Sequence, residues 1–185
     1  MRFLTVFWLS DAKIINCCYN ATAPNIGLRL NEERSTLKCY MGGGGYGITY
    51  EHAFDEGSIV SEDLYRKLMF GKLEIDEGML IENIVAQMIN ASGHKLYFYS
   101  KSSRIDSSDR MEIDFLISKA STTNRHNICP LEVKSGKNYT LTSLKKLMAK
   151  YDNYLSTSYY VLHDDDLKID EDGIVYLPLY MTPLL

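Results

Sequence analysis

Two short apolar segments that are interrupted by charged residues constrain the fold of this chain most strongly. They are residues 111–117, with the sequence Met-Glu-Ile-Asp-Phe-Leu-Ile, and residues 130–134, with the sequence Pro-Leu-Glu-Val-Lys. Each has the length and the apolar content of a buried β-strand. A charged group inside such a strand costs free energy unless it is paired with an opposite charge or binds a metal ion. The two segments therefore predict neighbouring strands that carry a polar site.

The alternation of side chains along a strand decides which of these charges can meet. Glu132 and Lys134 are expected on one face of their strand, with Leu131 and Val133 on the other. Asp114 lies between apolar neighbours of its own strand in the same way. An aspartate followed after a gap by Glu-x-Lys is the arrangement that a magnesium-dependent phosphodiesterase needs, so we treat Asp114, Glu132 and Lys134 as candidate catalytic residues.

Phosphodiester hydrolysis needs compensation of negative charge, an activated water and a stabilised leaving oxygen. Mg²⁺ bound by one or two carboxylates meets these needs and keeps several of its waters. On adjacent strands, the backbones of Asp114 and Glu132 would be only about 5 Å apart, so one ion could bridge them. The carbonyl of Val133 and the carboxylate of Glu82 are the further expected ligands. The ammonium of Lys134 would reach the attacking water or the phosphate.

A purely structural interpretation of the same residues stays open. Glu132 and Lys134 could form an exposed ion pair on an edge strand, which would contribute about 0–1 kcal/mol to stability. The presence of Asp114 in its own apolar strand, and of Glu82 on a preceding helix, favours a functional site over this interpretation.

Composition and charge are those of an ordinary globular protein. The 185 residues are 45% apolar and 24% charged, which suits one domain with an appendage. The net charge of −4 argues against general coating of nucleic acid. Residues 134–150 nevertheless carry lysines and no acidic residue, and we expect Lys137, Lys145 and Lys146 to contact DNA phosphates. The alternative without a functional role is that this run, like the acidic run at residues 164–172, is solvated surface.

Other cofactor motifs are missing from the sequence. The run Gly42–Gly45 is not followed by the Gly-Lys-Ser/Thr of a phosphate loop, so we expect a flexible linker and no ATP site. The four cysteines and four histidines lack zinc-ligand spacing. We expect the cysteines to be reduced and buried in a cytoplasmic protein, and the histidines to lie at the surface or in loops.

The N-terminus begins with the apolar run of residues 3–9. Asp11 and Lys13 interrupt this run, and no segment of transmembrane length follows, so we expect a core segment and no membrane partner. An abrupt apolar start is typical of a chain that has been cut out of something larger.

Hydrophobic periodicity predicts an α/β fold. An antiparallel strand pair is expected at residues 13–19 and 36–41, and a short helix at residues 61–70. The strongest helix prediction covers residues 78–91, with Glu82 beside the apolar face. The remaining predicted elements are strands at 95–100, 112–118 and 128–134, a helix at 140–155, and strands at 159–162 and 174–177. This alternation predicts a mixed central sheet flanked by helices.

The helix with Glu82, the strand with Asp114 and the run Glu132-Val133-Lys134 before a helix resemble the PD-(D/E)XK nuclease superfamily. Residues 78–180 more closely resemble the C-terminal domain of bacterial and archaeal AAA-type ATPases, which has a Glu-Ile-Asp-Phe-Leu-Ile strand and a Leu-Glu-Val-Lys-Ser-Gly segment. Residues 1–60 resemble the region that joins a winged-helix segment to that domain.

The resemblance implies a restriction-endonuclease-like core at residues 71–185 and an N-terminal linking appendage of strands and helix at residues 1–70. It implies that an ATPase module belongs to the full-length protein and that DNA is the partner. The superfamily's roles would fall on the helical acid Glu82, the metal ligands Asp114 and Glu132, and the lysine Lys134. The alternative is a catalytically inactive module that binds DNA or protein and regulates the same ATPase.

Overall fold

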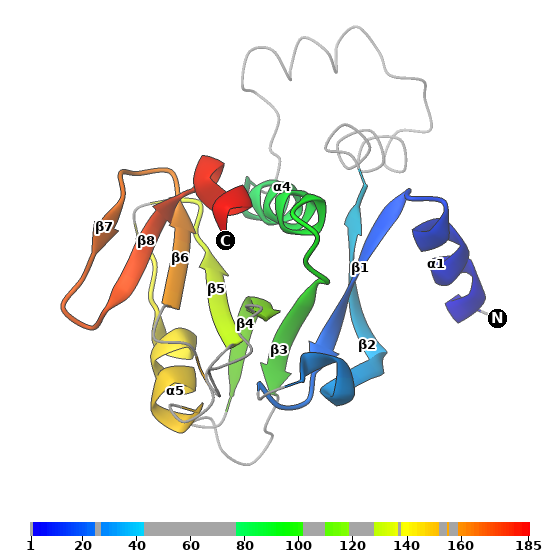
Figure 1. Ribbon diagram of the computed structural model, residues 1–185, viewed down its shortest axis with the longest axis horizontal. Helices are drawn as coiled ribbons and strands as arrows, with labels where there is room; N and C mark the ends of the chain where they lie inside the picture. Colours follow the sequence, from blue (N-terminus) through cyan, green and yellow to red (C-terminus); the bar gives the residue numbers. More distant parts are fainter. Residues whose placement is uncertain are drawn as a thin grey trace, which may run out of the picture.

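A single eight-stranded sheet organises the described part of the chain (Figure 1). The computed structural model describes residues 2–24, 27–42, 77–101, 110–118, 128–136, 138–151, 155 and 159–185. The strands are β1 (Ile15–Ala21), β2 (Glu32–Met41), β3 (Tyr97–Lys101), β4 (Met111–Ser118), β5 (Ile128–Val133), β6 (Tyr159–His163), β7 (Lys168–Ile169) and β8 (Ile174–Pro178). Their order across the sheet is β2-β1-β3-β4-β5-β6-β8-β7.

The sheet is mixed, as predicted. Strand β1 runs parallel to β3, and β5, β6 and β8 are parallel to one another. The β1–β2, β3–β4, β4–β5 and β7–β8 pairs are antiparallel. Figure 1 shows the β1–β2 pair and helix α1 (Arg2–Asp11) at one end of the sheet and β7 at the other.

Two helices cover opposite faces of the sheet. Helix α4 (Glu77–Ala91) buries Val85, Ala86 and Ile89 in the α4-side core, which also contains Phe115 and Leu131. These helical positions recur at the spacing of one helix face. Gly93 adopts a φ of +87°, a conformation that suits glycine in the turn after the helix.

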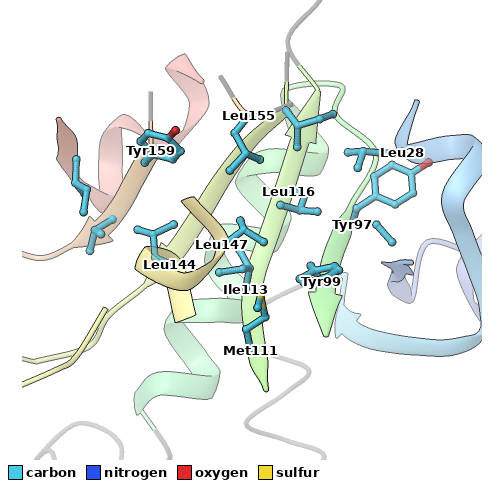
Figure 2. Packing of buried hydrophobic residues seen from close by; sticks show 14 residues of the cluster. Leu28, Tyr97, Tyr99, Met111, Ile113, Leu116, Leu144, Leu147, Leu155 and Tyr159 are labelled. Atoms are coloured by element: carbon cyan, nitrogen blue, oxygen red, sulfur yellow. The ribbon is translucent and has the colours of Figure 1, made fainter. Parts of the chain in front are cut away.

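Helix α5 (Thr142–Tyr151) covers the other face. Its Leu144 and Leu147 are fully buried in the α5-side core, against Ile113 and Leu116 of β4 (Figure 2). Because β4 contributes side chains to both cores, its interior is buried on both faces, and a charge placed there has little access to water.

Strand β4 contains a β-bulge at the position of Asp114. Tyr97 and Tyr99 of β3 oppose Leu116 and Ile113 of β4, so a step of two residues on one strand matches a step of three on the other. A bulge bends its strand and leaves the extra residue outside the ladder. Asp114 lies within the shifted stretch between Ile113 and Leu116, and its side chain reaches the main chain of β5 at Val133.

The predicted helices and strands within the described residues are confirmed, with small shifts at their ends. The expected core segment at residues 3–9 is wrong for Phe7 and Trp8, which are exposed on α1. Residues 32–35, expected to be a polar connection, extend β2, and residues 168–169 form the unpredicted strand β7. Two 3-10 helices, η1 (Leu28–Asn31) and η3 (Leu179–Leu184), were also not predicted. The predicted helix at 61–70 and the division at residue 70 lie outside the described residues.

The N-terminal strands are part of the same sheet rather than a separate layer. Strand β1 joins the sheet through its parallel pairing with β3, and the amide of Tyr19 donates to the carbonyl of Leu96 at 3.2 Å.

None of the helices in the described part of the chain combines the length and the apolar character that crossing a membrane requires.

Candidate functional site

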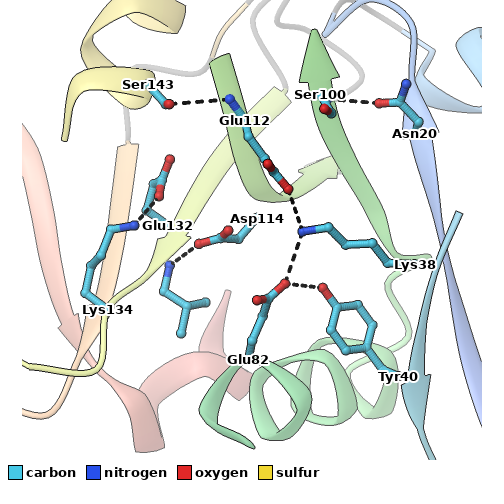
Figure 3. Close-up of polar contacts among 11 residues, drawn as sticks. Asn20, Lys38, Tyr40, Glu82, Ser100, Glu112, Asp114, Glu132, Lys134 and Ser143 are labelled. Carbon is cyan, nitrogen blue, oxygen red and sulfur yellow. Dashed lines mark hydrogen bonds and ion pairs between the residues drawn. The ribbon is translucent and has the colours of Figure 1, made fainter. Parts of the chain in front are cut away.

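Charged side chains from four elements converge where β4 and β5 separate (Figure 3). The residues are Lys38 of β2, Glu82 of α4, Glu112 and Asp114 of β4, Glu132 of β5, and Lys134 just after β5. We call these six residues the acidic cluster. The structure therefore brings together all four predicted catalytic residues, Glu82, Asp114, Glu132 and Lys134.

Asp114 lies at the centre of the acidic cluster. The last paired residues of β4 and β5 on this side are Phe115 and Leu131, and beyond them the amide of Val133 donates to Oδ2 of Asp114 at 2.8 Å. The carboxylate thus replaces a main-chain acceptor of the ladder. Burial raises the pKa of Asp114, the amide of Val133 opposes that shift, and the negative charge of Glu82 adds to it.

Glu132 is a buried carboxylate that is only partly satisfied. Its relative exposure is 4%, and its Oε2 lies 2.6 Å from Nζ of Lys134. Its Oε1 is buried and accepts no hydrogen bond from the residues that the structure describes. Burial and the charge of Asp114 raise the pKa of Glu132 to about 7, against the opposing charge of Lys134.

Glu82 is held by two residues of β2. Its Oε1 lies 3.3 Å from Nζ of Lys38 and also accepts a short hydrogen bond from the hydroxyl of Tyr40. Nζ of Lys38 lies 2.9 Å from Oε1 of Glu112 as well. Burial and the charge of Glu82 raise the pKa of Tyr40, so its hydroxyl stays protonated and donates to the carboxylate.

The charges of the acidic cluster do not balance. When all groups are ionised, the carboxylates of Glu82, Glu112, Asp114 and Glu132 face the ammonium groups of Lys38 and Lys134, which leaves two negative charges uncompensated. Buried carboxylates in this situation either take up protons or bind a cation. The pKa values of Asp114 and Glu132 are raised, which is the direction of proton uptake.

The donor set fits a hard divalent cation. Mg²⁺ binds through one or two carboxylates and keeps several waters, and Oε1 of Glu132 is a buried acceptor that lacks a donor among the described residues. Asp114 and Glu132 are the candidate ligands, each with one oxygen already bonded within the chain, whereas Glu82 is held by both Lys38 and Tyr40. Glu82, Asp114 and Glu132 do not form a group whose ligand atoms all lie within 4.8 Å of one another.

The lysines predicted to contact DNA are only partly placed. Lys145 pairs with Asp172 at 2.7 Å on the exposed side of α5. Lys146 donates to the carbonyl of Arg110, just before β4, at 3.4 Å. Lys137 lies outside the described residues.

Two members of the acidic cluster, Lys38 and Glu112, and the neighbouring Tyr40, which donates to Glu82, were not predicted as site residues. The signal in the sequence is that Lys38 stands between the apolar Leu37 and Cys39 in the second half of β2. The distance in sequence of Lys38 and Tyr40 from Glu82 hid the contact, since the pairing of β2 with the rest of the sheet depends on the tertiary fold.

The prediction that histidines lie at the surface or in loops is wrong for His163. His163 is the last residue of β6, and its relative exposure is 1%. Its Nδ1 accepts a hydrogen bond from the amide of Asp165 at 3.3 Å. Among the described residues, His163, Asp164 and Asp165 form the group whose ligand atoms lie within 4.8 Å of one another.

The prediction of buried cysteines holds for Cys17, Cys18 and Cys129 and is wrong for Cys39, which is exposed on the edge strand.

Comparison with known proteins identifies the segment that carries most of the acidic cluster. Residues 77–181 match the family model described as "Domain of unknown function (DUF4143)", a domain found in AAA-ATPase-associated proteins. No curated protein and no solved structure matches the chain. The match runs from α4 to η3 and leaves Lys38 and Tyr40 outside it. Because it covers more than half of the 185 residues, the chain belongs to the DUF4143 family.

Proposed function

We propose that the acidic cluster binds Mg²⁺ and that the chain is a nuclease-like domain that hydrolyses DNA phosphodiesters. The observation that carries this proposal is the buried, unsatisfied Oε1 of Glu132 beside Asp114 and Lys134. A buried carboxylate with an unused oxygen, a second carboxylate nearby and an ammonium group are the minimum set for metal-assisted attack on a phosphodiester.

Each residue has a distinct part in the proposed reaction. Asp114 and Glu132 would hold the ion, which supplies an activated water and offsets the charge of the phosphate when it is bound. The amide of Val133 fixes the orientation of Asp114 through its 2.8 Å hydrogen bond. Burial lowers the pKa of Lys134, but the charges of Glu132, Asp114 and Glu82 and the hydrogen bond to Glu132 together raise it, so Lys134 stays protonated and acts as a cation toward the phosphate and not as a base.

The order of elements supports placing this domain in the PD-(D/E)XK group. Helix α4 is followed by β3, β4 and β5, then by α5 and β6, and the candidate residues lie on α4, β4 and β5. This proposal also includes a restriction-endonuclease-like fold and an attached ATPase module. It further includes phosphate contacts by Lys137, Lys145 and Lys146.

A second function has an observation in its favour. Each of the carboxylates of Glu82, Asp114 and Glu132 already contacts a donor within the chain, from Lys38 and Tyr40, Val133 and Lys134 respectively. Such internal pairing is typical of a cluster that has been kept for folding. In that case the domain would be a non-catalytic module that binds DNA or protein and regulates the ATPase.

Cleavage of supercoiled plasmid DNA separates the two functions. The metal-free chain is incubated with plasmid and 5 to 10 mM Mg²⁺ or Mn²⁺ (about the saturating range for a millimolar site), beside Asp114→Asn and Glu132→Gln. The nuclease proposal expects nicking by the wild type that requires the metal and falls by a factor of about 10² or more in both variants.

The matched control is Glu171→Gln, which removes a carboxylate on the exposed turn before β8. It should cleave like the wild type. Equal cleavage by the wild type, Asp114→Asn and Glu132→Gln would indicate a contaminating nuclease. That result, or an absence of cleavage in every sample, would remove the catalytic proposal and leave the regulatory module.

A further inference from the structure

Lys38 occupies the position that a cation would take in the outer part of the acidic cluster. Its Nζ lies 3.3 Å from Glu82 and 2.9 Å from Glu112, so one ammonium bridges carboxylates from α4 and β4. The same Nζ lies 5.2 Å from the ring centre of Phe98, so the ammonium also makes a cation–π contact. The Lys38 side chain is 29% exposed, so these contacts are made with limited help from water.

Strand β2 holds Lys38 in this position through several independent contacts with the DUF4143 segment. The hydroxyl of Tyr40 donates to Glu82, and its ring packs on Phe115 with ring centres 5.5 Å apart. The amide of Met41 donates to Oδ1 of Asn83 at 2.7 Å. Tyr40 and Met41 of β2 therefore contact α4 and β4, and displacement of this part of β2 with Lys38 would break these contacts.

We propose that Lys38 is a built-in counter-cation that keeps Glu82 and Glu112 occupied and thereby weakens divalent-cation binding at Asp114 and Glu132. This inference deepens the proposed function and rests on its metal site. Lys38 acts in two ways. Its positive charge repels an incoming divalent ion, and its ion pair with Glu82 withholds a third carboxylate from that ion. It is therefore a positioning residue and does not take part in the chemistry.

The assignment explains two features of the acidic cluster together. Glu82 does not join Asp114 and Glu132 in a group within 4.8 Å, and Glu82 is the carboxylate that Lys38 and Tyr40 hold from β2. Lys38 also contributes to the field at Asp114, where its charge favours the ionised carboxylate. Because Lys38 lies outside residues 77–181, the control of the metal site belongs to the N-terminal segment rather than to the matched domain.

Calorimetric titration with Mn²⁺ tests the inference directly. The full chain is freed of metal and titrated as the wild type, Lys38→Met and the matched control Lys95→Met. Lys95 also pairs with a carboxylate, Glu32 at 2.5 Å, so its replacement removes the same charge away from the acidic cluster. We expect Lys38→Met to bind Mn²⁺ about tenfold more tightly than the wild type, and Lys95→Met to stay within about twofold.

The outcomes separate the inference from the function on which it rests. Equal Mn²⁺ affinity in the wild type and Lys38→Met would overturn the role of Lys38 and leave the metal site intact. No binding by any variant would remove the metal site and both proposals with it. If Lys38→Met does not fold, Lys38→Gln keeps a polar side chain and should show the same gain, whereas Lys38→Arg keeps the charge and should bind like the wild type.

Discussion

Asp114 and Glu132 are acids that sit where ionisation is unfavourable. Both lie in strands whose neighbouring residues pack in the two cores, and the charge of Asp114 adds to the cost of ionising Glu132. The chain tolerates them because Val133 and Lys134 satisfy part of their hydrogen-bonding capacity. A free-energy cost of this kind is often found where side chains are kept for binding or catalysis.

The stability of the metal-free chain should therefore fall as the pH rises from about 5 to 8. The pKa of Glu132 is about 7 in the folded state against an ordinary value of 4.5, so the folded chain binds more protons than the unfolded chain between these values. Stability from this group is present at low pH and is lost as the pH rises through that interval, by on the order of 3 kcal/mol in total. Urea unfolding curves at several pH values in a chelator measure the free energy of unfolding.

Glu132→Gln removes the titrating group and should flatten that dependence. Some slope should remain in this variant, because the raised pKa of Asp114 acts in the same direction. Glu171→Gln, on the exposed turn, should keep the wild-type slope. Identical slopes in the wild type and Glu132→Gln would contradict the burial of an ionisable carboxylate at this position.

At the scale of single residues, the sequence indicated which groups matter but not how they meet. Alternation along an apolar strand singled out Asp114, Glu132 and Lys134, because a charge in such a strand needs a partner. The bulge that includes Asp114 depends on the register of β4 with β3, which no local pattern encodes. Lys38 was missed for the related reason that its partners, Glu82 and Glu112, are distant in sequence.

The contact between β2 and α4 is the element-scale feature on which the acidic cluster depends. Asn83 is 8% exposed, and its Oδ1 is the acceptor for the amide of Met41 at 2.7 Å. In one turn of α4, Glu82 thus contacts side chains of β2 and Asn83 accepts a hydrogen bond from the backbone of β2. The helix ties the edge of the sheet to its centre through this turn.

Asn83→Ala should destabilise the fold by about 1–3 kcal/mol, because it leaves a partly buried amide without its acceptor. Asn90→Ala is the matched control on the same helix. Asn90 is exposed, and its side chain bonds only the Oδ1 of Asn16 at 3.1 Å among the hydrogen bonds described, so the expected change is within about 0.5 kcal/mol. Chemical denaturation at constant pH measures both values, and equal losses would show that the Met41 contact contributes little.

The elements themselves were largely predictable. Helical spacing in residues 78–91 and 140–155 gave α4 and α5, because each helix has one face that must be buried. The short strand β7 was not found because two residues show no periodicity, and its side chains are exposed. The polar residues at the start of β2 hid its true length, since an edge strand need not alternate with apolar residues.

On the scale of the whole molecule, the N-terminal segment and the DUF4143 segment share one sheet and one core. Cys18 and Tyr40 of the N-terminal strands pack in the α4-side core beside Val85 and Phe115. The sequence predicted these strands and their antiparallel pairing but treated them as an appendage. Their place in the sheet follows from the parallel pairing of β1 with β3, a long-range contact that depends on the whole fold.

This shared core predicts that β1 and β4 lose their structure in a single global transition. Native-state hydrogen exchange should give backbone amides of both strands the same free energy of opening and the same dependence on denaturant, because neither strand can leave without exposing the α4-side core. Amides of α1, whose Phe7 and Trp8 side chains are exposed, should open at lower free energy and serve as an internal reference for local fraying. If amides of β1 exchange at a lower free energy than those of β4, the N-terminal strands form a separate unit. Lys38 could then leave the acidic cluster without global unfolding, and β2 would be a detachable element of the metal site.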